Sequence, residues 1–264
     1  MQETRLIEDK AREIFGRRAR MYVDSRAHTD PVVLNRLIAL TQPQPDWRVL
    51  DVATGTGHTA FAFSPHVLEV VGIDITPQML DLAEELALER AIANVRFRLA
   101  NIHHLPFDDE TFDGEGFDLV TCRRAAHHFR DIHEALSEMV RMLKPGGLLL
   151  IDDRSVPEDS YIDSIMNRLD WLHDESHVRQ YRPSEWQAML AKAGCQVQVV
   201  ESYERIRPLS SLTADVSAEN VAAIDELLKD MTVEEQQLIE LTKKGEELYS
   251  KHWYVTVLGK KATS

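Results

Sequence analysis

A nine-residue stretch at positions 49–57, Val-Leu-Asp-Val-Ala-Thr-Gly-Thr-Gly, constrains the fold of this chain more than any other. An apolar run with β propensity ends in an acid and then in two glycines one residue apart, and a helical pattern follows. This order is typical of a strand that leads through a tight turn into a helix. Gly55 and Gly57 allow positive φ and let a ligand approach free main-chain N–H groups. The stretch predicts a site for a nucleotide-like cofactor, although a tight connection without a ligand would use the same glycines.

Asp51 bears on the identity of that cofactor. The run from Gly55 to Ala60, Gly-Thr-Gly-His-Thr-Ala, also satisfies the G-x-G-x-x-G/A fingerprint of dinucleotide sites. A carboxylate at the end of the strand, four residues before Gly55, would repel a pyrophosphate and attract an ammonium group. The pattern therefore favours S-adenosylmethionine, whose methionine part carries an ammonium group. An NAD-dependent oxidoreductase is the alternative.

Composition limits the class of protein. The 264 residues are 44% hydrophobic, which suits one elaborated domain. A net charge of −14 argues against a nucleic-acid partner, because binding phosphates needs clustered Lys and Arg. The basic cluster at 17–20 is expected to be the solvated face of a helix. No run of eighteen apolar residues occurs and the first ten residues are polar, so we expect no membrane span and a cytoplasmic protein. Cys122 and Cys195 are expected to be buried core thiols.

Helical and strand patterns alternate through residues 49–152, which predicts an α/β fold with a parallel sheet. Asp30, Thr76 and Asp131 are expected to cap helices at their N-termini. The expected elements, in chain order, are helix 8–21, helix 31–40, strand 49–52, strand 68–75, a helix starting at 77, strand 95–99, strand 117–122, a helix starting at 132 and strand 148–152.

The pattern changes after residue 153. Helical segments are expected at 160–174 and 184–193, a sixth strand at 197–203, helices at 217–229 and 233–248, and a last strand at 253–258. We interpret the chain as one domain, 1–264. Its expected parts are N-terminal helices covering the cofactor site (1–45), a core (46–204), a helical insert (205–252) and the last strand with a tail (253–264).

The ordered set of motifs resembles the class I, Rossmann-like S-adenosylmethionine-dependent methyltransferases, in the branch similar to ubiquinone and menaquinone C-methyltransferases. The motifs that carry the resemblance are Val-Leu-Asp-Val-Ala-Thr-Gly-Thr-Gly-His at 49–58, Gly-Ile-Asp-Ile-Thr-Pro-Gln-Met at 72–79, Leu-Pro-Phe at 105–107, Phe-Asp-Leu-Val-Thr-Cys at 117–122, Leu-Lys-Pro-Gly-Gly at 143–147, His-His-Phe at 127–129, Ser-His-Val-Arg at 176–179 and Ser-Glu-Trp at 184–186.

This resemblance implies a seven-stranded mixed sheet in the order 3-2-1-4-5-7-6, with the last strand antiparallel and helices on both faces. It also implies that Asp74 accepts hydrogen bonds from the ribose hydroxyls of the cofactor. Asn101 replaces the usual acid near the adenine, and the acidic stretch 107–117 is read as an exposed loop. The implied cofactor contacts are Asp51, Thr54, Gly55, Thr56, Gly57, Asp74, Ile75, Met79, Asn101, Ile102 and Arg123.

Methyl transfer from a sulfonium needs alignment of the acceptor, exclusion of water and sometimes removal of a proton. Open α/β sheets place their ligands beyond the carboxyl ends of the strands. A histidine there can act as a base and an arginine can hold an acidic substrate. The candidate catalytic or positioning residues after the fourth and fifth strands are Arg123, Arg124, His127, His128, Asp152 and Asp153.

Three further expectations concern partners and ligands. His177 and Arg179 are assigned to a cover over the acceptor site, and Trp186 to the core. His173 and His177 have the i, i+4 spacing of metal ligands, but no Cys pair or His-Glu-x-x-His pattern accompanies them, so no metal is predicted. The expected partner is a small-molecule substrate, with a homodimer through the late helices. A non-enzymatic cofactor-binding or dimerisation module is the third function considered.

Overall fold

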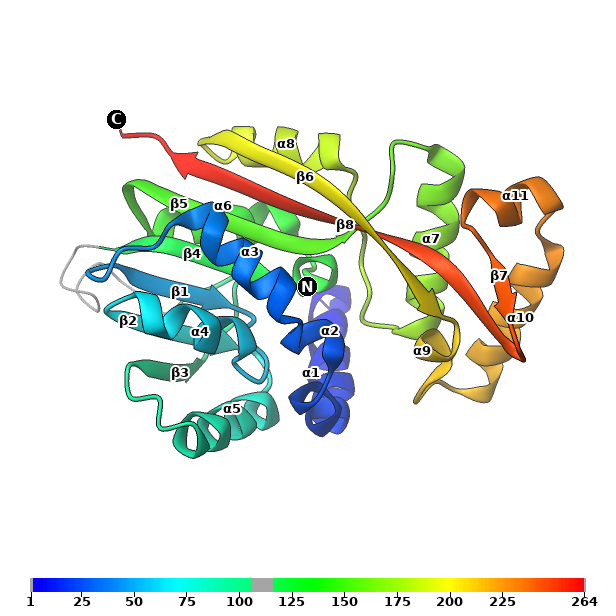
Figure 1. Cartoon of the computed structure of the whole chain (residues 1–264), viewed down its shortest axis with the longest axis horizontal. Coiled ribbons are helices and arrows are strands. Elements are labelled where there is room, and N and C mark those ends of the chain that lie inside the picture. Colours follow the sequence, from blue (N-terminus) through cyan, green and yellow to red (C-terminus); the bar gives the residue numbers. More distant parts are fainter. Residues whose placement is uncertain (1, 106–115, 264) are drawn as a thin grey trace.

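The computed structural model describes residues 2–105 and 116–263, and it contains an eight-stranded sheet in the order β3-β2-β1-β4-β5-β8-β6, with β7 paired to β8 (Figure 1). Strands β1 to β5 pair in parallel, and β8 is antiparallel to both β5 and β6. The expected strand order and the antiparallel last strand are confirmed, while β7 is an additional short strand. The strands are β1 Arg48–Val52, β2 Glu69–Asp74, β3 Val95–Leu99, β4 Phe117–Arg123, β5 Leu143–Ser155, β6 Cys195–Pro208, β7 Thr242–Lys244 and β8 Glu247–Lys261.

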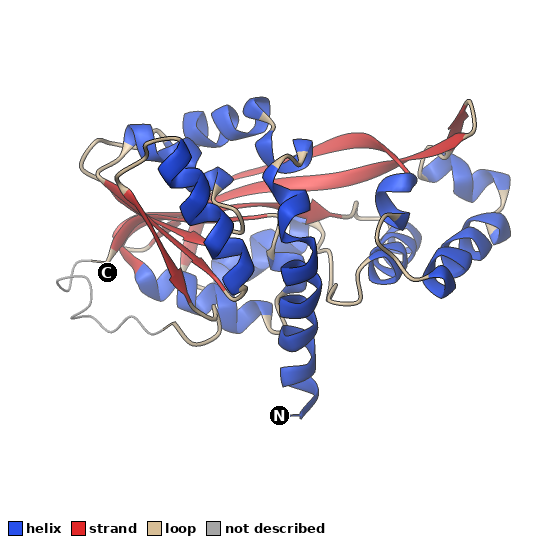
Figure 2. Cartoon of the chain, turned by 90° about the horizontal axis from the view of Figure 1, so that it is seen from below, coloured by secondary structure: helices blue, strands red, loops and turns tan. Residues whose placement is uncertain are grey.

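Helices cover both faces of the sheet (Figure 2). Successive strand residues point to opposite faces, so Val49 and Leu50 enter different cores. The Val49 core is closed by α3 (Pro31–Thr41), α4 (His58–Phe63) and α5 (Pro77–Glu89). The Leu50 core is closed by α6 (Ile132–Met142) and α8 (Pro183–Lys192). Cys122 and Cys195 are both buried in the Leu50 core, as expected.

Two of the three expected helix caps form as predicted. The Asp30 carboxylate accepts the Val32 N–H at 2.9 Å, and the Asp131 carboxylate accepts two N–H groups at the start of α6. Thr76 is the N-cap residue of α5, but its side chain makes no capping bond. The Asp74 carboxylate accepts the Thr76 N–H instead, at 2.8 Å. Asp74, at the end of β2, therefore fixes the residue from which α5 starts.

The largest difference from the sequence prediction lies in the C-terminal third. Residues 233–248 were expected to form one helix, but α11 ends at Leu238 and a β7–β8 hairpin follows, with Gly245 at φ +64° in its turn. β6 runs to Pro208 and β8 starts at Glu247, so the helical insert is confined to 209–246 rather than 205–252. Long-range pairing, from Cys195 with Lys261 to Pro208 with Tyr249, supplies backbone hydrogen bonds that the local pattern does not reveal.

The long β6–β8 ribbon carries a separate group of helices beyond the rest of the sheet, at the right of Figure 1. Helix α7 (Ser160–His173) packs there with the insert helices around Trp253 and Ile239. The insert helices are α9 Ser210–Thr213, α10 Ala218–Asp230 and α11 Val233–Leu238.

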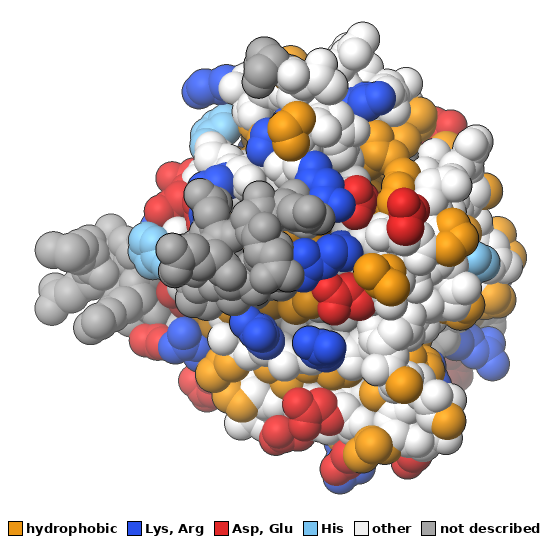
Figure 3. Space-filling model, turned by 90° about the vertical axis from the view of Figure 1, so that its left-hand side faces the viewer, with side chains coloured by type: hydrophobic (Ala, Val, Ile, Leu, Met, Phe, Trp, Pro, Cys, Tyr) orange, Lys and Arg blue, Asp and Glu red, His pale blue; other side chains and the backbone are white. Residues whose placement is uncertain are grey.

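The N-terminal helices α1 (Gln2–Val23) and α2 (Arg26–Thr29) pass the end of the sheet, and α1 packs against α5 through Ala19, Met79 and Leu82. Within residues 2–105 and 116–263, no helix is long and apolar enough to cross a bilayer. The face at the left of Figure 1 carries basic and acidic side chains next to one another (Figure 3). The loop expected at 107–117 falls almost wholly outside the described residues.

Trp186 is fully buried in the Leu50 core, with its ring edge-on to Tyr181 at 5.5 Å. Replacing Trp186 with Ala should lower the free energy of unfolding by about 3 to 5 kcal/mol, because a large cavity is left. Urea denaturation followed by circular dichroism measures this. Trp171→Ala is the control: that side chain is 40% exposed, and its loss should cost less than about 1 kcal/mol. Equal effects would contradict the assignment of Trp186 to the core.

Candidate active site

The turn between β1 and α4 opens onto a cavity. Gly55 has φ +52°, and a Cβ built on it would meet no atom within 4 Å, so this backbone faces open space. Gly57 has φ +85°, and its Cβ would lie 2.8 Å from the Phe61 ring. The first glycine leaves room for a ligand, and the second allows the helix that follows to pack closely.

Asp51 lies behind this turn rather than in the cavity. It is 1% exposed, and its two oxygens accept hydrogen bonds from the hydroxyls of Thr54 at 2.6 Å and Thr121 at 2.7 Å. Burial raises the pKa of Asp51, and these hydroxyls oppose the shift. The carboxylate therefore orients Thr54, which does line the cavity.

Asp74 forms part of the cavity wall and organises it. Its Oδ2 accepts the Gly55 N–H at 2.9 Å while Oδ1 accepts the Thr76 N–H. Burial raises the pKa of this carboxyl group, and the two backbone donors counteract the shift. Each oxygen retains a lone pair, so the carboxylate can also accept from hydroxyl groups of a ligand.

This main cavity lies beyond the carboxyl ends of β1, β2 and β4, where the strand order reverses direction. Helix α1 closes one side of it, and its apolar walls suit an aromatic base. Of the residues expected to contact the cofactor, Asp51 and Gly57 do not line it. The lining residues include Glu8, Ala11, Phe15, Tyr22, His28, Thr54, Gly55, Thr56, His58, Asp74, Ile75, Met79, Asn101, Ile102, His103, Arg123, Arg124, His128 and Phe129.

Asn101 is held by side chains that sequence reasoning did not identify. Its Oδ1 accepts the His103 N–H at 3.0 Å, and its Nδ2 donates to Glu8 of α1 at 2.9 Å. Glu8 also pairs with Arg130 at 2.9 Å. Hydrogen bonds from Asn101 and Arg130 lower the pKa of Glu8, although burial opposes them. This cluster attaches the N-terminal helix to the rim of the cavity.

The two arginines after β4 have different surroundings. Arg123 donates to the Thr59 hydroxyl at 2.9 Å and to the carbonyls of Ala27 and His28, so its guanidinium fixes the end of α2 against the sheet. Arg124 has φ +57° and lies against the Tyr254 ring, with its Cζ 3.8 Å from the centroid.

Asp152 reaches neither cavity. It is fully buried and accepts the hydroxyls of Tyr203 and Thr256, both at 2.9 Å, and one oxygen lies 3.5 Å from Arg124 Nε. The structure therefore places Asp152 where it positions Arg124.

A second cavity adjoins the main one and is more polar. Five residues line both cavities and form the boundary between them: Phe15, Tyr22, His28, Arg124 and His128. The remaining wall comes from α1, α7, the segment after α7, and the long C-terminal strands. Its other polar residues are Arg18, Ser25, His127, Arg154, Asp170, His173, Asp174, His177, Arg207, Ser211 and Tyr254.

The two adjacent histidines are each connected to a carboxyl group, His127 directly and His128 through a serine hydroxyl. His127 Nδ1 lies 2.7 Å from Asp153, and burial lowers the pKa of the imidazole well below its usual value. His128 Nδ1 lies 3.1 Å from the Ser176 hydroxyl, which donates to Asp174 at 2.6 Å. Burial opposes ionisation of Asp174, but His128, Ser176 and Arg18 hold its pKa at about 2.

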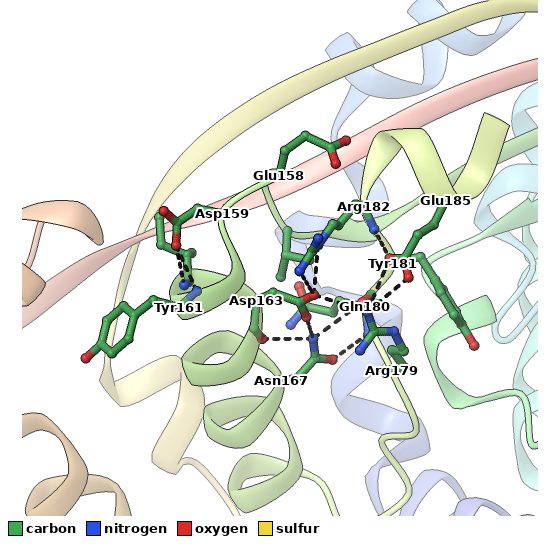
Figure 4. Close-up of polar contacts among 12 residues, drawn as sticks. Glu158, Asp159, Tyr161, Asp163, Asn167, Arg179, Gln180, Tyr181, Arg182 and Glu185 are labelled. Carbon is green, nitrogen blue, oxygen red and sulfur yellow. Dashed lines mark hydrogen bonds and ion pairs between the residues drawn. The ribbon is translucent and has the colours of Figure 1, made fainter. Parts of the chain in front are cut away.

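His177 lines the second cavity, whereas Arg179 points into a supporting network (Figure 4). The Asp163 carboxylate of α7 contacts Arg179 at 3.1 Å and Arg182 at 2.8 Å. Asn167 Oδ1 accepts the Gln180 N–H at 2.7 Å and lies 3.0 Å from His177 Nε2. The network fixes the segment that carries His177 to α7.

The basic cluster of α1 is not simply a solvated face. Arg18 is buried and pairs with Asp174 at 3.2 Å and with Asp215 at 2.9 Å, while Arg17 remains exposed.

His173, one of the two histidines with metal-ligand spacing, places its Nδ1 2.9 Å from the Leu212 carbonyl. Among the described residues, no group of three or more His, Cys, Asp or Glu side chains is arranged to hold a metal.

Comparison with known proteins agrees with this geometry. Residues 43–194 match the family model described as a methyltransferase domain. An uncharacterized methyltransferase of Bacillus subtilis, YcgJ, is 42% identical over 67% of this chain and 68% of its own length. The crystal structure of YcgJ superimposes with a TM-score of 0.80, at 33% identity, covering 88% of this chain and 98% of that one. A demethylmenaquinone methyltransferase of Deinococcus radiodurans is 38% identical over 48% of this chain and half its own length.

The chain therefore belongs to the methyltransferase-domain family. It is a Rossmann-like, S-adenosylmethionine-dependent methyltransferase, and the NAD-dependent alternative is set aside. The residues present fit the cofactor: the open backbone at Gly55 can receive its amino-acid end, and the buried Asp74 carboxylate can accept from its ribose. Ile75, Met79 and Ile102 offer apolar contacts for its adenine.

Asp74→Ala should weaken the binding of S-adenosylhomocysteine by about 1.5 to 3 kcal/mol, because charge-assisted hydrogen bonds are lost. Isothermal titration calorimetry measures the change. Asp81→Ala, an exposed acid on α5, is the control and should leave the affinity unaltered. An unchanged affinity for the Asp74 variant would remove this residue from the cofactor site.

Burial raises the pKa of Asp153 to about 6, above the 3.8 of an exposed carboxyl group. The folded protein therefore holds this proton more tightly than the unfolded chain. The resulting stabilisation is complete below about pH 4 and is lost as the pH rises through 6. Between about pH 4 and a pH above 6, the free energy of unfolding of the wild type should fall by up to about 3 kcal/mol relative to that of Asp153→Asn. Urea titrations at several pH values measure the free energy of unfolding, and Asp46→Asn, a change at an exposed acid, is the control. If the free energies of wild type and Asp153→Asn change with pH in parallel, the prediction is contradicted.

Proposed function

We propose that the chain methylates a small-molecule acceptor held in the second cavity, with His128 positioned to take a proton from it. The observation that carries this proposal is the shared wall: His128 lines both the main cavity and the second cavity. A group bound in the second cavity would face the cofactor across this wall. The bound cofactor supplies an electrophilic methyl group on a sulfonium.

The hydrogen-bond pattern assigns the proton on His128. Asp174 is ionised and can only accept, so the Ser176 hydroxyl donates its proton to that carboxylate. The Ser176 oxygen then accepts from His128 Nδ1–H, so Nε2 is the nitrogen that carries the lone pair when the imidazole is neutral. A neutral imidazole oriented in this way can remove a proton from an oxygen, nitrogen or activated carbon.

His177 provides a second hydrogen-bond acceptor in the same cavity. Asn167 Nδ2 donates to Asp163, so Asn167 Oδ1 is the acceptor that faces His177 Nε2–H. His177 Nδ1 is consequently the unprotonated nitrogen, and it is buried without a hydrogen-bond partner in the described chain. An acceptor molecule bearing a hydroxyl or N–H group would satisfy it.

Exclusion of water is the other requirement of the reaction. Phe15 and Tyr22 of α1 lie at the boundary between the cavities, and Phe15 packs edge-on against His128 with ring centroids 4.9 Å apart. These contacts place an apolar helix face beside the proposed transfer point. The N-terminal helices thus cover the site in this proposal.

The proposed function is tested by incubating the purified protein with S-adenosylmethionine and separate phenols, quinones and small acids. Formation of S-adenosylhomocysteine together with a methylated product, measured by mass spectrometry, supports it. Cofactor binding without product from any member of the panel counts against the small-molecule assignment.

His128→Gln should reduce kcat about 100-fold or more with the acceptor found in that screen, because the proton acceptor is lost. Calorimetry should show that His128→Gln binds S-adenosylhomocysteine within about threefold of wild type, because His128 is assigned to the acceptor and pairs with no charged group of the cofactor. His133→Gln, exposed on α6, is the matched control and should retain full turnover. A His128 variant with undiminished kcat would exclude this residue as the base.

A further inference from the structure

We propose that the second cavity recognises an anionic group of the acceptor, a carboxylate or a phosphate, through Arg154 and Arg207 with Arg124 beside them. The inference rests on the proposed function, because it assigns the chemical class of the molecule bound in that cavity. It adds a recognition site formed by Arg154 near the end of β5 and Arg207 near the end of β6, next to Arg124 at the boundary with the main cavity.

Three arginines lie around Tyr254: Arg154 of β5, Arg207 of β6, and Arg124, which directly follows β4. Arg154 of β5 is the cross-strand partner of Tyr254 in β8. Arg207 of β6 places Nη1 3.5 Å from the Tyr254 hydroxyl, and Arg124 lies over the ring of the same tyrosine. All four residues line the second cavity. The sheet itself therefore brings the cations together.

The nearby carboxylates do not fully neutralise this cluster. Arg154 pairs with Asp170 at 2.6 Å, and Arg124 has only the longer 3.5 Å contact with Asp152. No carboxylate among the described residues lies within ion-pair distance of Arg207. The excess charge of the cluster is positive.

The acids that line the cavity are already engaged. Asp170 accepts from the Gln180 side chain as well as pairing with Arg154, and Asp174 accepts from Ser176 and pairs with Arg18. Each of these carboxylates has its own cation. Asp170 also lies in the field of Arg207, but its ion pair is with Arg154, so it does not pair with Arg207.

Two donors in the cluster lack hydrogen-bond acceptors. The Nε atoms of Arg124 and Arg154 are buried and donate no hydrogen bond within the part of the chain that the structure describes, although Asp152 lies 3.5 Å from Arg124 Nε. Arg154 is only 9% exposed. A buried donor without an acceptor is unfavourable, and an oxyanion would supply the missing acceptors. Arginine is suited to this role because its planar guanidinium matches carboxylate and phosphate oxygens.

The titration of neighbouring groups reports the same positive field. Burial alone would raise the pKa of Tyr254, yet Arg124, Arg207 and Arg154 lower it. Tyr22, which is also buried, shows the opposite direction, with a pKa raised to about 12. Burial, reinforced by Arg154, lowers the pKa of His173 to about 4. The cavity disfavours added positive charge, as expected of an anion site.

The test measures anion binding without turnover. Full-length protein saturated with S-adenosylhomocysteine is titrated by calorimetry with inorganic phosphate and, separately, with benzoate at constant ionic strength. At least one probe should bind, and the stronger one identifies the anion class. Arg207→Gln should weaken that binding at least tenfold while leaving S-adenosylhomocysteine affinity unchanged. Arg207→Lys, which keeps the charge, should bind within about threefold of wild type.

Arg168→Gln is the matched control, since Arg168 is exposed over Trp171 on α7 and lines neither cavity. It removes the same charge and should bind the probe like wild type. Binding of neither probe, or equal affinity in wild type and Arg207→Gln, overturns the inference. Anion binding without methyl transfer supports the inference and counts against the proposed function. Turnover of uncharged acceptors alone, unaffected by Arg207→Gln, overturns the inference and leaves the proposed function standing.

Discussion

The carboxylate of Asp74 links the elements on which the cofactor site depends. It stands at the end of β2 and accepts the N–H of Gly55 from the turn after β1 and the N–H of Thr76 at the start of α5. A buried charge is tolerated there because backbone donors surround it. The same geometry that stabilises two loops also leaves lone pairs on the carboxylate, which lines the cavity and can accept hydrogen bonds from a ligand there.

The rest of the site depends on long-range contacts made by the ends of the chain. Helix α1 contributes Phe15 and Tyr22 to the boundary of the two cavities, although it precedes the sheet in sequence. The ribbon of β6 and β8 extends past the other strands and brings Arg207 and Tyr254 to the wall of the second cavity. The proposed acceptor site thus combines residues of the matched region 43–194, among them His128 and Arg154, with residues of the segments that flank it.

Low solvent access gives the second cavity its electrostatic character. Burial drives His127, His173 and His177 towards the neutral form, and arginines add to the shift. The acids nearby are held by specific donors. Neutral imidazoles and fixed guanidinium groups line the same cavity, which is a consistent arrangement for the acidic acceptor proposed above.

The sequence alone determined the glycine turn, the caps at Asp30 and Asp131, and the choice of Asp74 and His128 as candidates, because these depend on local patterns; the strand order followed from the family that the motifs resemble. It also indicated Asp51 and Asp152 as site residues, but only the tertiary structure placed them behind the cavity walls. Local pattern could not predict the β7–β8 hairpin at 242–261, since helix spacing and strand pairing compete there and the distant β6 decides the outcome. For the same reason the convergence of Arg124, Arg154 and Arg207 is a property of the folded sheet, which brings together cations far apart in the chain.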